Sequence, residues 1–335
     1  MFTKLYETIL KYIKKEYKFL ITLLIILLIS TIKLPYYIDM PGGIINISDR
    51  VSIDEKTNLT GTLNFAYVSE TRATIPTYIL SKLNKDWDII KKEEVVLKNE
   101  TEQESKFRDQ LSLKEAISNA LYRGFKESGE DFQIINNKIY ITYVYEQAKT
   151  NLKIGDQILK INEKEIKTKE DLKFVNNYEV GTKLEIQVLN NKKEYTRNAE
   201  IIELDNKKII GVGIKEIFDI ESNHNINISY EARESGPSGG MMMALTVYSH
   251  ITNQDLTKGK KIVGTGTIDK EGNVGEIGGV KYKLIGAVKN QADIFIVPQK
   301  NYEEAQKIKE ERNYDIKIVE VKTLKETIDI LKNLR

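Results

Sequence analysis

The longest uncharged stretch of the chain lies near its amino end. Residues 19–32 read FLITLLIILLISTI, fourteen residues without a charge. A membrane-spanning helix needs about 20 residues, and the lysines and tyrosines on either side are residue types that lie at a membrane interface. The pattern therefore predicts one N-terminal transmembrane helix over residues 19–38. A cleaved signal peptide is the alternative, because its apolar region runs about 7–15 residues, although no small-residue cleavage site follows this stretch.

The charges around this stretch predict its orientation. Five lysines precede it, at positions 4, 11, 14, 15 and 18, whereas Lys33 and Arg50 are the nearest basic residues after it. Basic residues are retained on the cytoplasmic side of a membrane. We therefore expect a cytoplasmic tail over residues 1–18 and a single-pass cell-membrane protein whose working domains, from residue 39 onward, are extracellular.

Residues 39–130 form the first part of this expected exterior and carry no recognisable functional motif. Pro41-Gly42-Gly43 interrupts the pattern in the manner of a linker. Residues 61–68 alternate apolar and polar side chains, which predicts a strand, and residues 112–127 read as a capped helix. The region is interpreted as a structural or spacing module. In an alternative interpretation, the strands within residues 44–70 pack on the last domain, and the module between them is an insertion.

From about residue 131 onward, apolar and polar side chains alternate regularly along the chain. Strands are predicted over 138–145 and 181–189, on either side of the run LKIGDQILKIN at 152–162 and of a helix at 168–175. In these features residues 131–201 resemble a PDZ domain of the bacterial protease-associated kind. The resemblance implies a β-rich domain that binds peptides by adding a strand to a sheet edge. No carboxylate-binding glycine loop precedes Ile139, so peptide binding and a role as spacer or lid both stay open.

The composition restricts the chemistry that the chain can carry. Its 335 residues are enough for two or three domains, and 41% hydrophobic with 30% charged residues allow buried cores. Lysine and arginine number 51 against 49 acids, so the net charge of +2 predicts no nucleic-acid partner. There is no cysteine, and His224 and His250 are the two histidines, which excludes thiol catalysis and multi-histidine metal centres. We expect no metal and no cofactor, with catalysis by Ser, Thr, Lys, Asp, Glu or Tyr.

A turn rich in glycine carries the first chemical motif. Residues 233–245 read RESGPSGGMMMAL, between a predicted strand and a predicted apolar helix. Ser238 then lies at a helix amino terminus, where unpaired N–H groups and the helix dipole favour an oxyanion. Gly236, Pro237 and Gly239 leave room for a substrate beside it. A serine that only caps the helix is the alternative.

A second motif supplies a candidate base. Residues 275–287 read GEIGGVKYKLIGA, in which a double glycine brings Lys281 to the start of another predicted helix. A lysine acts as a base only when it is deprotonated, and burial lowers its pKa toward neutrality. A serine paired with a lysine is a known nucleophile–base pair. A solvated lysine at an ordinary helix start is the alternative.

Together the two motifs resemble the proteolytic domain of the Lon family of serine proteases. The matching pieces are GPSGG with a following AL, a TG-x-I strand and IGGVKYK, and the resemblance covers residues 205–335. It implies an α/β (α+β) domain in which Ser238 is the nucleophile and Lys281, forty-three residues later, is the general base. It further implies that Thr265, and less directly Thr267, lie near the amine of that base.

Neighbouring residues receive no catalytic role. Lys283 is interpreted as an outward, structural neighbour of the base, and Glu234 as a surface charge. Gly239 stands where the family usually has alanine, and Ser235 stands where its ATP-dependent members carry an acid. His250 ends the helix that follows the serine, about 18 Å away along its axis, and is interpreted as a polar helix-end residue.

The order of the segments resembles the membrane-tethered PDZ–Lon proteases of Gram-positive bacteria. The resemblance implies a serine endopeptidase that cleaves peptides or proteins outside the cell, with the PDZ-like module aiding recruitment or gating. We expect it to be ATP-independent, because no G-x-x-x-x-G-K-[ST] motif occurs. Lon-type domains often oligomerise, so a homo-oligomer is a further expectation. Two alternatives stay open: a non-catalytic PDZ adaptor with a degenerate Lon-like domain, and an enzyme that binds phosphate with its GPSGG loop.

Overall fold

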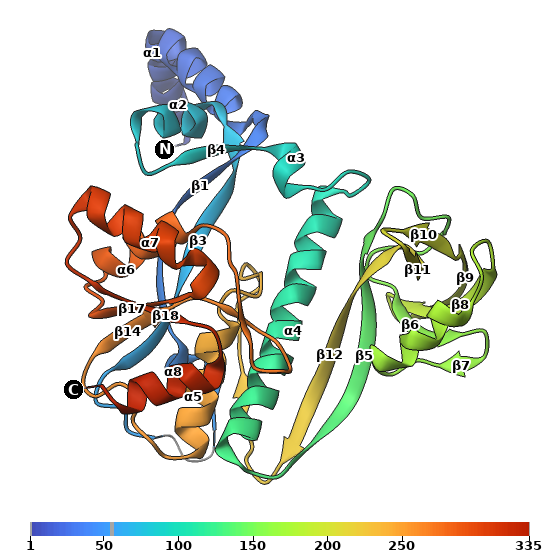
Figure 1. Cartoon of the computed structure of the whole chain (residues 1–335). Coiled ribbons are helices and arrows are strands. Elements are labelled where there is room, and N and C mark those ends of the chain that lie inside the picture. Colours follow the sequence, from blue (N-terminus) through green and yellow to red (C-terminus); the bar gives the residue numbers. More distant parts are fainter. Residues whose placement is uncertain (1, 54–56, 335) are drawn as a thin grey trace. The chain divides into compact units, whose positions relative to one another are not determined.

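The computed structural model describes residues 2–53 and 57–334 (Figure 1). The chain divides into two compact units, one of Met1–Met40 with Ser69–Val95 and one of Pro41–Val68 with Val96–Arg335. The long strands β1 (Lys33–Asn46) and β3 (Thr62–Thr74) contribute residues to both units.

The first unit contains helix α1 and a small group of elements after it. These elements are α1 (Phe2–Thr31), the first part of β1, the end of β3, α2 (Ile75–Leu83), β4 (Asp88–Lys91) and α3 (Lys92–Val95). Strand β4 pairs antiparallel with β1, with Tyr36 opposite Lys91 and Asp39 opposite Asp88. Burial, and to a smaller extent the neighbouring Asp88, raise the pKa of the Asp39 carboxyl to about 6.

Helix α1 corrects the prediction of a transmembrane anchor. No helix in the described ranges combines the length and the apolar character that crossing a membrane requires. Helix α1 ends at Thr31 and the chain is a strand from Lys33, so Tyr36 and Tyr37, which were expected to prolong the span, belong to β1 instead. The preceding helical turns carry charged residues at positions 14, 15, 16 and 18. The predicted transmembrane helix at 19–38 is therefore wrong, and so is the single-pass cell-membrane assignment. The expectation of an extracellular catalytic domain rested on that helix and loses its support.

The second unit is built on a sheet between two groups of helices. Strand β14 (Lys261–Gly264) pairs in parallel with β3 on one side and with β17 (Ile294–Pro298) on the other, and β17 pairs in parallel with β18 (Lys317–Val321). The helices of this part are α4 (Glu102–Ser128), α5 (Gly240–Ile251), α6 (Val280–Lys289), α7 (Gln299–Arg312) and α8 (Leu324–Lys332). Thr62–Phe65 of β3 lie directly beside β14, so residues 44–70 do contribute to the last domain, as in the alternative interpretation of the sequence.

Strand β17 shows how the two faces of this sheet are covered. Ile294 and Ile296 belong to a core shared with α4, α5 and α8, whereas Phe295 and Val297 belong to a core shared with α6 and α7. Successive side chains of a strand point to opposite faces, so a strand buried on both sides is apolar throughout. Figure 1 shows α6 and α7 on one side of the sheet and α5 and α8 on the other.

Several short elements complete this part of the unit. They are η1 (Ile47–Asp49), β2 (Val51–Ser52), β13 (Asn227–Ile228), β15 (Thr267–Ile268) and β16 (Val274–Gly275). Strands β2 and β13 pair antiparallel, as do β15 and β16. The β2–β13 pair brings a distant part of the sequence beside the segment that leads to α5, whereas β15 and β16 form a local hairpin.

A β-rich module follows helix α4. Its strands are β5 (Phe132–Val144), β6 (Gln157–Ile161), β7 (Lys164–Glu165), β8 (Lys183–Asn190), β9 (Lys193–Glu200), β10 (Ile202–Leu204), β11 (Lys207–Ile209) and β12 (Val212–Ser222). The main sheet has the order β12-β5-β6-β8-β9 and is antiparallel throughout. The helix predicted at 168–175 is a 3₁₀-helix, η2 (Glu170–Asn177). Asp156 of the predicted GD turn is fully buried and accepts hydrogen bonds from Lys153 N (2.9 Å) and Asn190 Nδ2 (2.7 Å), which gives that carboxylate a structural role.

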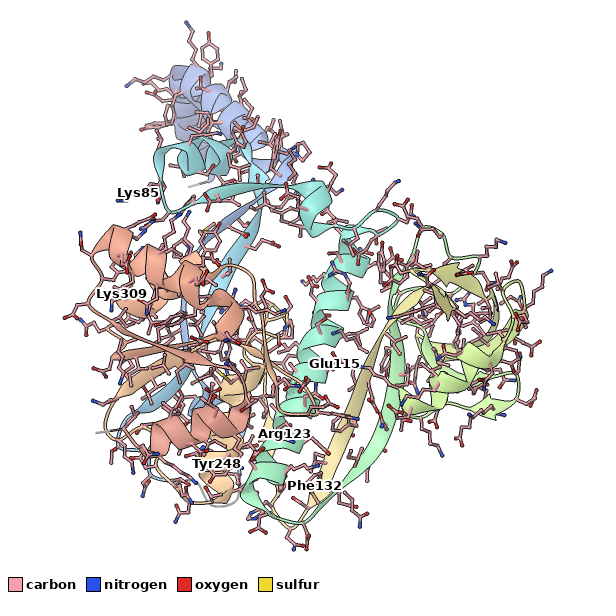
Figure 2. All side chains as sticks on the ribbon, in the orientation of Figure 1. Lys85, Glu115, Arg123, Phe132, Tyr248 and Lys309 are labelled. Atoms are coloured by element: carbon pink, nitrogen blue, oxygen red, sulfur yellow. The ribbon has the colours of Figure 1, made fainter. Side chains whose placement is uncertain are left out.

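Helix α4 connects this module to the rest of the unit. Thr101 and Glu104 form a capping box at its start, and Gly129 with a φ of +80° ends it. Near its centre the buried Glu115 accepts hydrogen bonds from Lys169 (2.8 Å), in the β-rich module, and pairs with Lys215 of β12 (2.7 Å; Figure 2). The helix also packs against α5, so it contacts both the β-rich module and the element that follows Ser238.

Candidate active site

Ser238 lies two residues before helix α5, in the last turn of the glycine-rich loop. Gly239 is the N-cap of the helix, and Gly236 has a φ of +84°, a conformation that favours glycine. The N–H of Gly236 donates to the backbone oxygen of Asp109 on α4 (3.0 Å). Gly236, Ser238 and Gly239 all line one cavity, so three of the predicted site residues come together there. Pro237 lines a different, larger groove instead.

The N–H groups around Ser238 differ in whether they have an acceptor. Those of Gly240 and Met241 donate to the oxygens of Pro237 (3.1 Å) and Gly266 (3.1 Å). Within the described part of the chain, the N–H groups of Ser238 and Gly239 have no acceptor. These two groups, beside the positive end of the α5 dipole, are therefore the donors that an oxyanion could use.

Thr265 holds the backbone of Ser238. Its side chain is fully buried, and its hydroxyl donates to the backbone oxygen of Ser238 (3.2 Å). The N–H of Gly266 donates to the same oxygen (2.7 Å). The hydrogen bond that the Thr265 hydroxyl donates is thus to the peptide of Ser238, and not to a lysine side chain. Thr267 lines the same groove as Pro237 and does not line the cavity at Ser238.

The cavity at Ser238 has a volume of about 160 Å³ and mostly apolar walls. Phe65 comes from β3, Leu113 and Ile117 come from α4, and Met243 comes from the first turn of α5. The polar side chains that line it are Arg50, Tyr67, Ser229, Tyr230, Glu234, Ser235, Ser238 and Lys283. The cavity is thus a small apolar site with a serine and a lysine in its wall.

The lysine in this wall is Lys283, not the predicted Lys281. Lys283 is 3% exposed, and burial lowers the pKa of its amine from 10.5 to about 8. Lys281 is half-buried, does not line the cavity, and has its amine over the ring of Tyr282, 5.3 Å from the ring centre. Residues two apart on a helix point in nearly opposite directions, so α6 places only Lys283 of the two lysines in the wall of this cavity. The interpretation of Lys283 as an outward neighbour is therefore corrected.

A signal for Lys283 was present in the sequence. Val280, Leu284 and Ala287 are buried on one face of α6, and Lys283 is the one charged residue within that i, i+3, i+4, i+7 pattern. A lysine on the apolar face of a helix is a candidate for a lowered pKa. The choice of Lys281 rested on its place after the double glycine and on the resemblance to the Lon family, and neither considers which face of the helix a residue occupies.

Two other expectations concern residues near the motifs. His250 is buried at the end of α5, where its Nδ1 accepts a hydrogen bond from the N–H of Thr57 (3.2 Å), in keeping with a polar helix-end residue. Glu234 was expected to be a surface charge. Its side chain is only 20% exposed, lines the cavity and forms an ion pair with Arg50 (2.6 Å), so that expectation is wrong.

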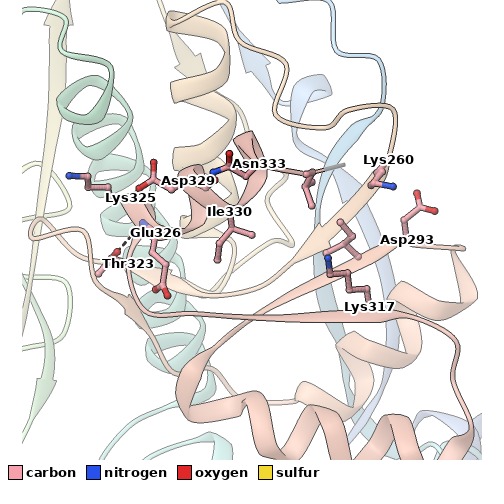
Figure 3. Close-up of a pocket in the computed structure, with 11 residues that line it drawn as sticks. Lys260, Asp293, Lys317, Thr323, Lys325, Glu326, Asp329, Ile330 and Asn333 are labelled. Atoms are coloured by element: carbon pink, nitrogen blue, oxygen red, sulfur yellow. Dashed lines mark hydrogen bonds between the residues drawn. The ribbon is translucent and has the colours of Figure 1, made fainter.

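A larger hollow lies elsewhere in the same unit. It has a volume of about 1090 Å³ and is lined by charged and polar residues from α8 and from the starts of β17 and β18, including Lys317, Thr323 and Asp329 (Figure 3). None of the predicted site residues lines it. In the ranges 2–53 and 57–334, no group of three or more His, Asp or Glu side chains is arranged to hold a metal ion.

Comparison with known families assigns both parts of this unit. Residues 212–333 match the C-terminal proteolytic domain of Lon protease (S16), and residues 127–202 match the PDZ domain. The chain contains a Lon-type proteolytic domain and a PDZ domain. Ser238, Thr265 and Lys283 all lie within the residues matched to the Lon-type domain.

Individual relatives agree with this assignment over part of the chain. The Lon protease of Campylobacter concisus is 40% identical over 102 residues, which cover 30% of this chain and 12% of the relative. The Lon protease of Aster yellows witches'-broom phytoplasma is 32% identical over 114 residues, which cover 34% of this chain and 14% of the relative. The chain thus spans about an eighth of the length of these relatives. Among solved structures, the PDZ domain of an SdrC-like protein from Listeria monocytogenes is similar at 20% identity and a TM-score of 0.21, over 23% of this chain and 85% of that one.

The Lon-type domain obtains part of its cavity from outside the matched residues. Arg50 and Phe65 precede the PDZ domain in the sequence, and Leu113 and Ile117 lie on α4. The region 39–130, in which the sequence shows no functional signal, therefore supplies much of the cavity wall. Parallel pairing of β3 with β14 brings Phe65 there, pairing of β2 with β13 brings Arg50, and the packing of α4 on α5 brings Leu113 and Ile117.

Proposed function

We propose that the chain is a serine endopeptidase in which Ser238 is the nucleophile and Lys283 is the general base. The observation that carries the proposal is that both side chains line the same 160 Å³ cavity, where burial brings the pKa of the Lys283 amine to about 8. A lysine with an ordinary pKa is almost fully protonated at neutral pH, whereas an amine with a pKa near 8 is deprotonated in a useful fraction. The proposal replaces Lys281 by Lys283 as the base.

The proposed reaction begins with attack of Ser238 Oγ on the carbonyl carbon of a peptide bond. Neutral Lys283 accepts the hydroxyl proton and then gives a proton to the departing amine, which leaves an acyl-enzyme. A water molecule, deprotonated by the same lysine, attacks the ester carbonyl; the bond to Ser238 Oγ then breaks, the lysine returns the proton to that oxygen, and the acid product is released. The N–H groups of Ser238 and Gly239 would donate to the oxyanion in both steps, and the bond from Thr265 to the Ser238 carbonyl supports their orientation.

The substrates proposed are peptides or proteins that present an extended segment to this cavity. The cavity is too small for a folded domain and mostly apolar. We further propose that hydrolysis by this chain needs no nucleotide, because the sequence contains no phosphate-binding G-x-x-x-x-G-K-[ST] loop. In this proposal the PDZ domain recruits substrates or controls their access, a role supported by the contact between Lys169 and Glu115 on α4.

Three variants and one labelling reagent test the proposal. Hydrolysis of a set of quenched fluorogenic peptides and of unfolded casein is measured without nucleotide, for the unchanged protein and for Ser238→Ala, Lys283→Arg and Lys281→Arg. We expect Ser238→Ala and Lys283→Arg to lose hydrolysis by several orders of magnitude, because guanidinium does not act as a base at usable pH. Lys281→Arg should stay active. A fluorophosphonate should label the unchanged protein and fail to label Ser238→Ala.

The opposite pattern has a defined meaning. If Lys281→Arg were inactive and Lys283→Arg active, the base would be Lys281, as the sequence motif first suggested. If the unchanged protein neither hydrolysed any substrate nor reacted with the fluorophosphonate, the non-catalytic adaptor would be the better description.

A further inference from the structure

The loop before Ser238 is attached to a segment almost two hundred residues earlier in the sequence. Ile228 and Asn227 of β13 pair with Val51 and Ser52 of β2. Directly after this pairing, the N–H and hydroxyl of Ser229 both donate to the backbone oxygen of Arg50 (2.9 and 3.1 Å). The segment that carries Arg50 therefore runs alongside the start of the loop. We call residues 229–236 the nucleophile loop.

The side chain of Arg50 continues this attachment. Its Nη2 donates to Glu234 Oε1 (2.6 Å) and to Glu231 Oε1 (3.1 Å). The other oxygen of Glu234 accepts the N–H of Glu231 (3.0 Å), and the N–H of Glu234 donates to the oxygen of Glu231 (2.9 Å). One carboxylate thus closes the turn at 231–234 and binds the arginine at the same time.

The ion pair between Arg50 and Glu234 is more buried than an ordinary surface ion pair. The side chains of Arg50 and Glu234 are 23% and 20% exposed, and both line the cavity at Ser238. Exposed ion pairs contribute little, but charge-assisted hydrogen bonds that are short and partly buried are stronger. By contrast, Arg233, whose side chain is 85% exposed, pairs with Glu231 and does not line the cavity.

The position of Glu234 connects the ion pair to the nucleophile. Glu234 is four residues before Ser238, and between them the N–H of Gly236 donates to Asp109 on α4. Gln110 of the same helix donates to the oxygen of Ala232 (3.2 Å). The nucleophile loop is thus held by α4 on one side and by Arg50 on the other. If Arg50 released Glu234, the turn at 231–234 would lose one of its two attachments.

We propose that Arg50 is a positioning residue, which through Glu234 holds the nucleophile loop in the conformation in which Ser238 can react. The proposal rests on the proposed function, since it concerns the reactivity of the same serine. Arg50 itself does not touch the reacting atoms. Its role is to keep the competent loop conformation populated, so its loss lowers the fraction of molecules that can react.

A double-mutant cycle tests this role. The full chain and its Arg50→Gln, Glu234→Gln and Arg50→Gln/Glu234→Gln variants are compared in peptide hydrolysis and in the rate of fluorophosphonate labelling at Ser238. We expect each single variant to lower kcat and the labelling rate by about tenfold with KM little changed, and the double variant to be no worse than either single one. Arg233→Gln is the matched control, because it removes an arginine from the same loop and should leave both rates unchanged.

Folding is monitored by the urea midpoint of each variant. Arg50→Lys keeps the positive charge and one hydrogen bond to Glu234. If Arg50 positions the loop, Arg50→Lys should keep more hydrolytic activity than Arg50→Gln even when the two variants have similar urea midpoints. A residue that contributes only to stability would not produce this difference in activity. The positioning role would be overturned by any of three results: unchanged rates in Arg50→Gln, additive losses in the double variant, or a change in KM alone. Failure of the proposed function is distinguishable, because it would appear as hydrolysis that survives Ser238→Ala whatever the Arg50 variants do.

Discussion

Burial of Lys283 should destabilise the folded protein below about pH 8, and replacement by methionine should remove this penalty. The side chain is 3% exposed, and burial lowers the pKa of its amine from 10.5 to about 8. That difference of about 2.5 corresponds to about 3 kcal/mol, at about 1.36 kcal/mol for each pH unit. Methionine has a similar length and no charge, so Lys283→Met should raise the free energy of unfolding by up to about 3 kcal/mol at pH 7 while abolishing hydrolysis.

The pH dependence of this gain identifies its cause. Between about pH 8 and 10.5 the unfolded chain binds a proton at Lys283 that the folded protein does not bind, so the free energy of unfolding rises with pH in that window. Below pH 8 both states bind the proton, and the penalty is constant. The advantage of Lys283→Met should therefore be full at pH 7 and should shrink as the pH approaches 10.

Urea denaturation at pH 7 and at pH 10 measures both quantities. Lys281→Met serves as the control, because it removes a lysine from the same helix but outside the cavity. It should keep hydrolysis and give no comparable gain. If Lys283→Met were no more stable than the unchanged protein at pH 7, or if its advantage were equal at the two pH values, burial of a charged amine would not be the cause.

Three further predictions follow from the same contacts. Initial rates of peptide hydrolysis should rise about tenfold per pH unit up to about pH 8 and then level off, since only the neutral amine accepts a proton; a flat profile between pH 6 and 9 would exclude Lys283 as the base. Thr265→Val keeps the shape of the side chain but removes the hydrogen bond to the Ser238 carbonyl, so the free energy of unfolding in urea should fall by about 1 kcal/mol and kcat should also fall. An unchanged free energy of unfolding and an unchanged kcat would contradict a role for this hydrogen bond. Burial raises the pKa of the Glu115 carboxyl, but the nearby Lys215 and Lys169 lower it by more than that, so the pKa lies below its ordinary value. Glu115→Gln should therefore cost about 3 kcal/mol near neutral pH, and this difference should disappear as the pH falls through the lowered pKa, which denaturation at pH 7 and pH 3 would reveal.

The β-rich module was the part of the fold most accessible from sequence. Strands with one buried face alternate apolar and polar residues, and such alternation is visible in β5 and β8 without knowledge of the partner strands. The helix expected beside them is a 3₁₀-helix over Glu170–Asn177, a difference in hydrogen bonding that a short apolar pattern does not specify. Matches of residues 127–202 and 212–333 to the PDZ and Lon-type domains agree with the motifs that suggested them.

The cavity at Ser238 could be predicted only in part. The glycine-rich turn located the serine, because a turn and the following helix are local features. The contribution of residues 39–68 depends on the pairing of β3 with β14 and of β2 with β13, which joins residues far apart in the chain. The ion pair of Arg50 with Glu234 depends on the same pairing, and a single sequence gives no signal for it.

The wrong prediction at α1 and the corrected interpretation of Lys283 on α6 have a common origin. In each case the composition of a segment was noted correctly, but its geometry was not. The apolar run at 19–32 was extended by flanking tyrosines that are in fact strand residues of β1. On α6, closeness to the helix start was given more weight than the face on which each lysine lies, although the periodicity of Val280, Leu284 and Ala287 identifies the buried face.

The apolar wall of the cavity links the strength of the proposed base to the choice of substrate. Among the described residues no charged group contributes to the lowered pKa of Lys283, whose cause is burial alone. Phe65, Leu113 and Met243 belong to the wall that excludes water from this amine, and the same side chains would contact a substrate residue that enters the cavity. A wall made more polar to accept a polar substrate side chain would also admit water, raise the pKa of Lys283 and leave less neutral amine at pH 7. In the proposed Ser–Lys site, where burial alone lowers the pKa of Lys283, an apolar substrate preference and the strength of the proposed base therefore depend on the same side chains.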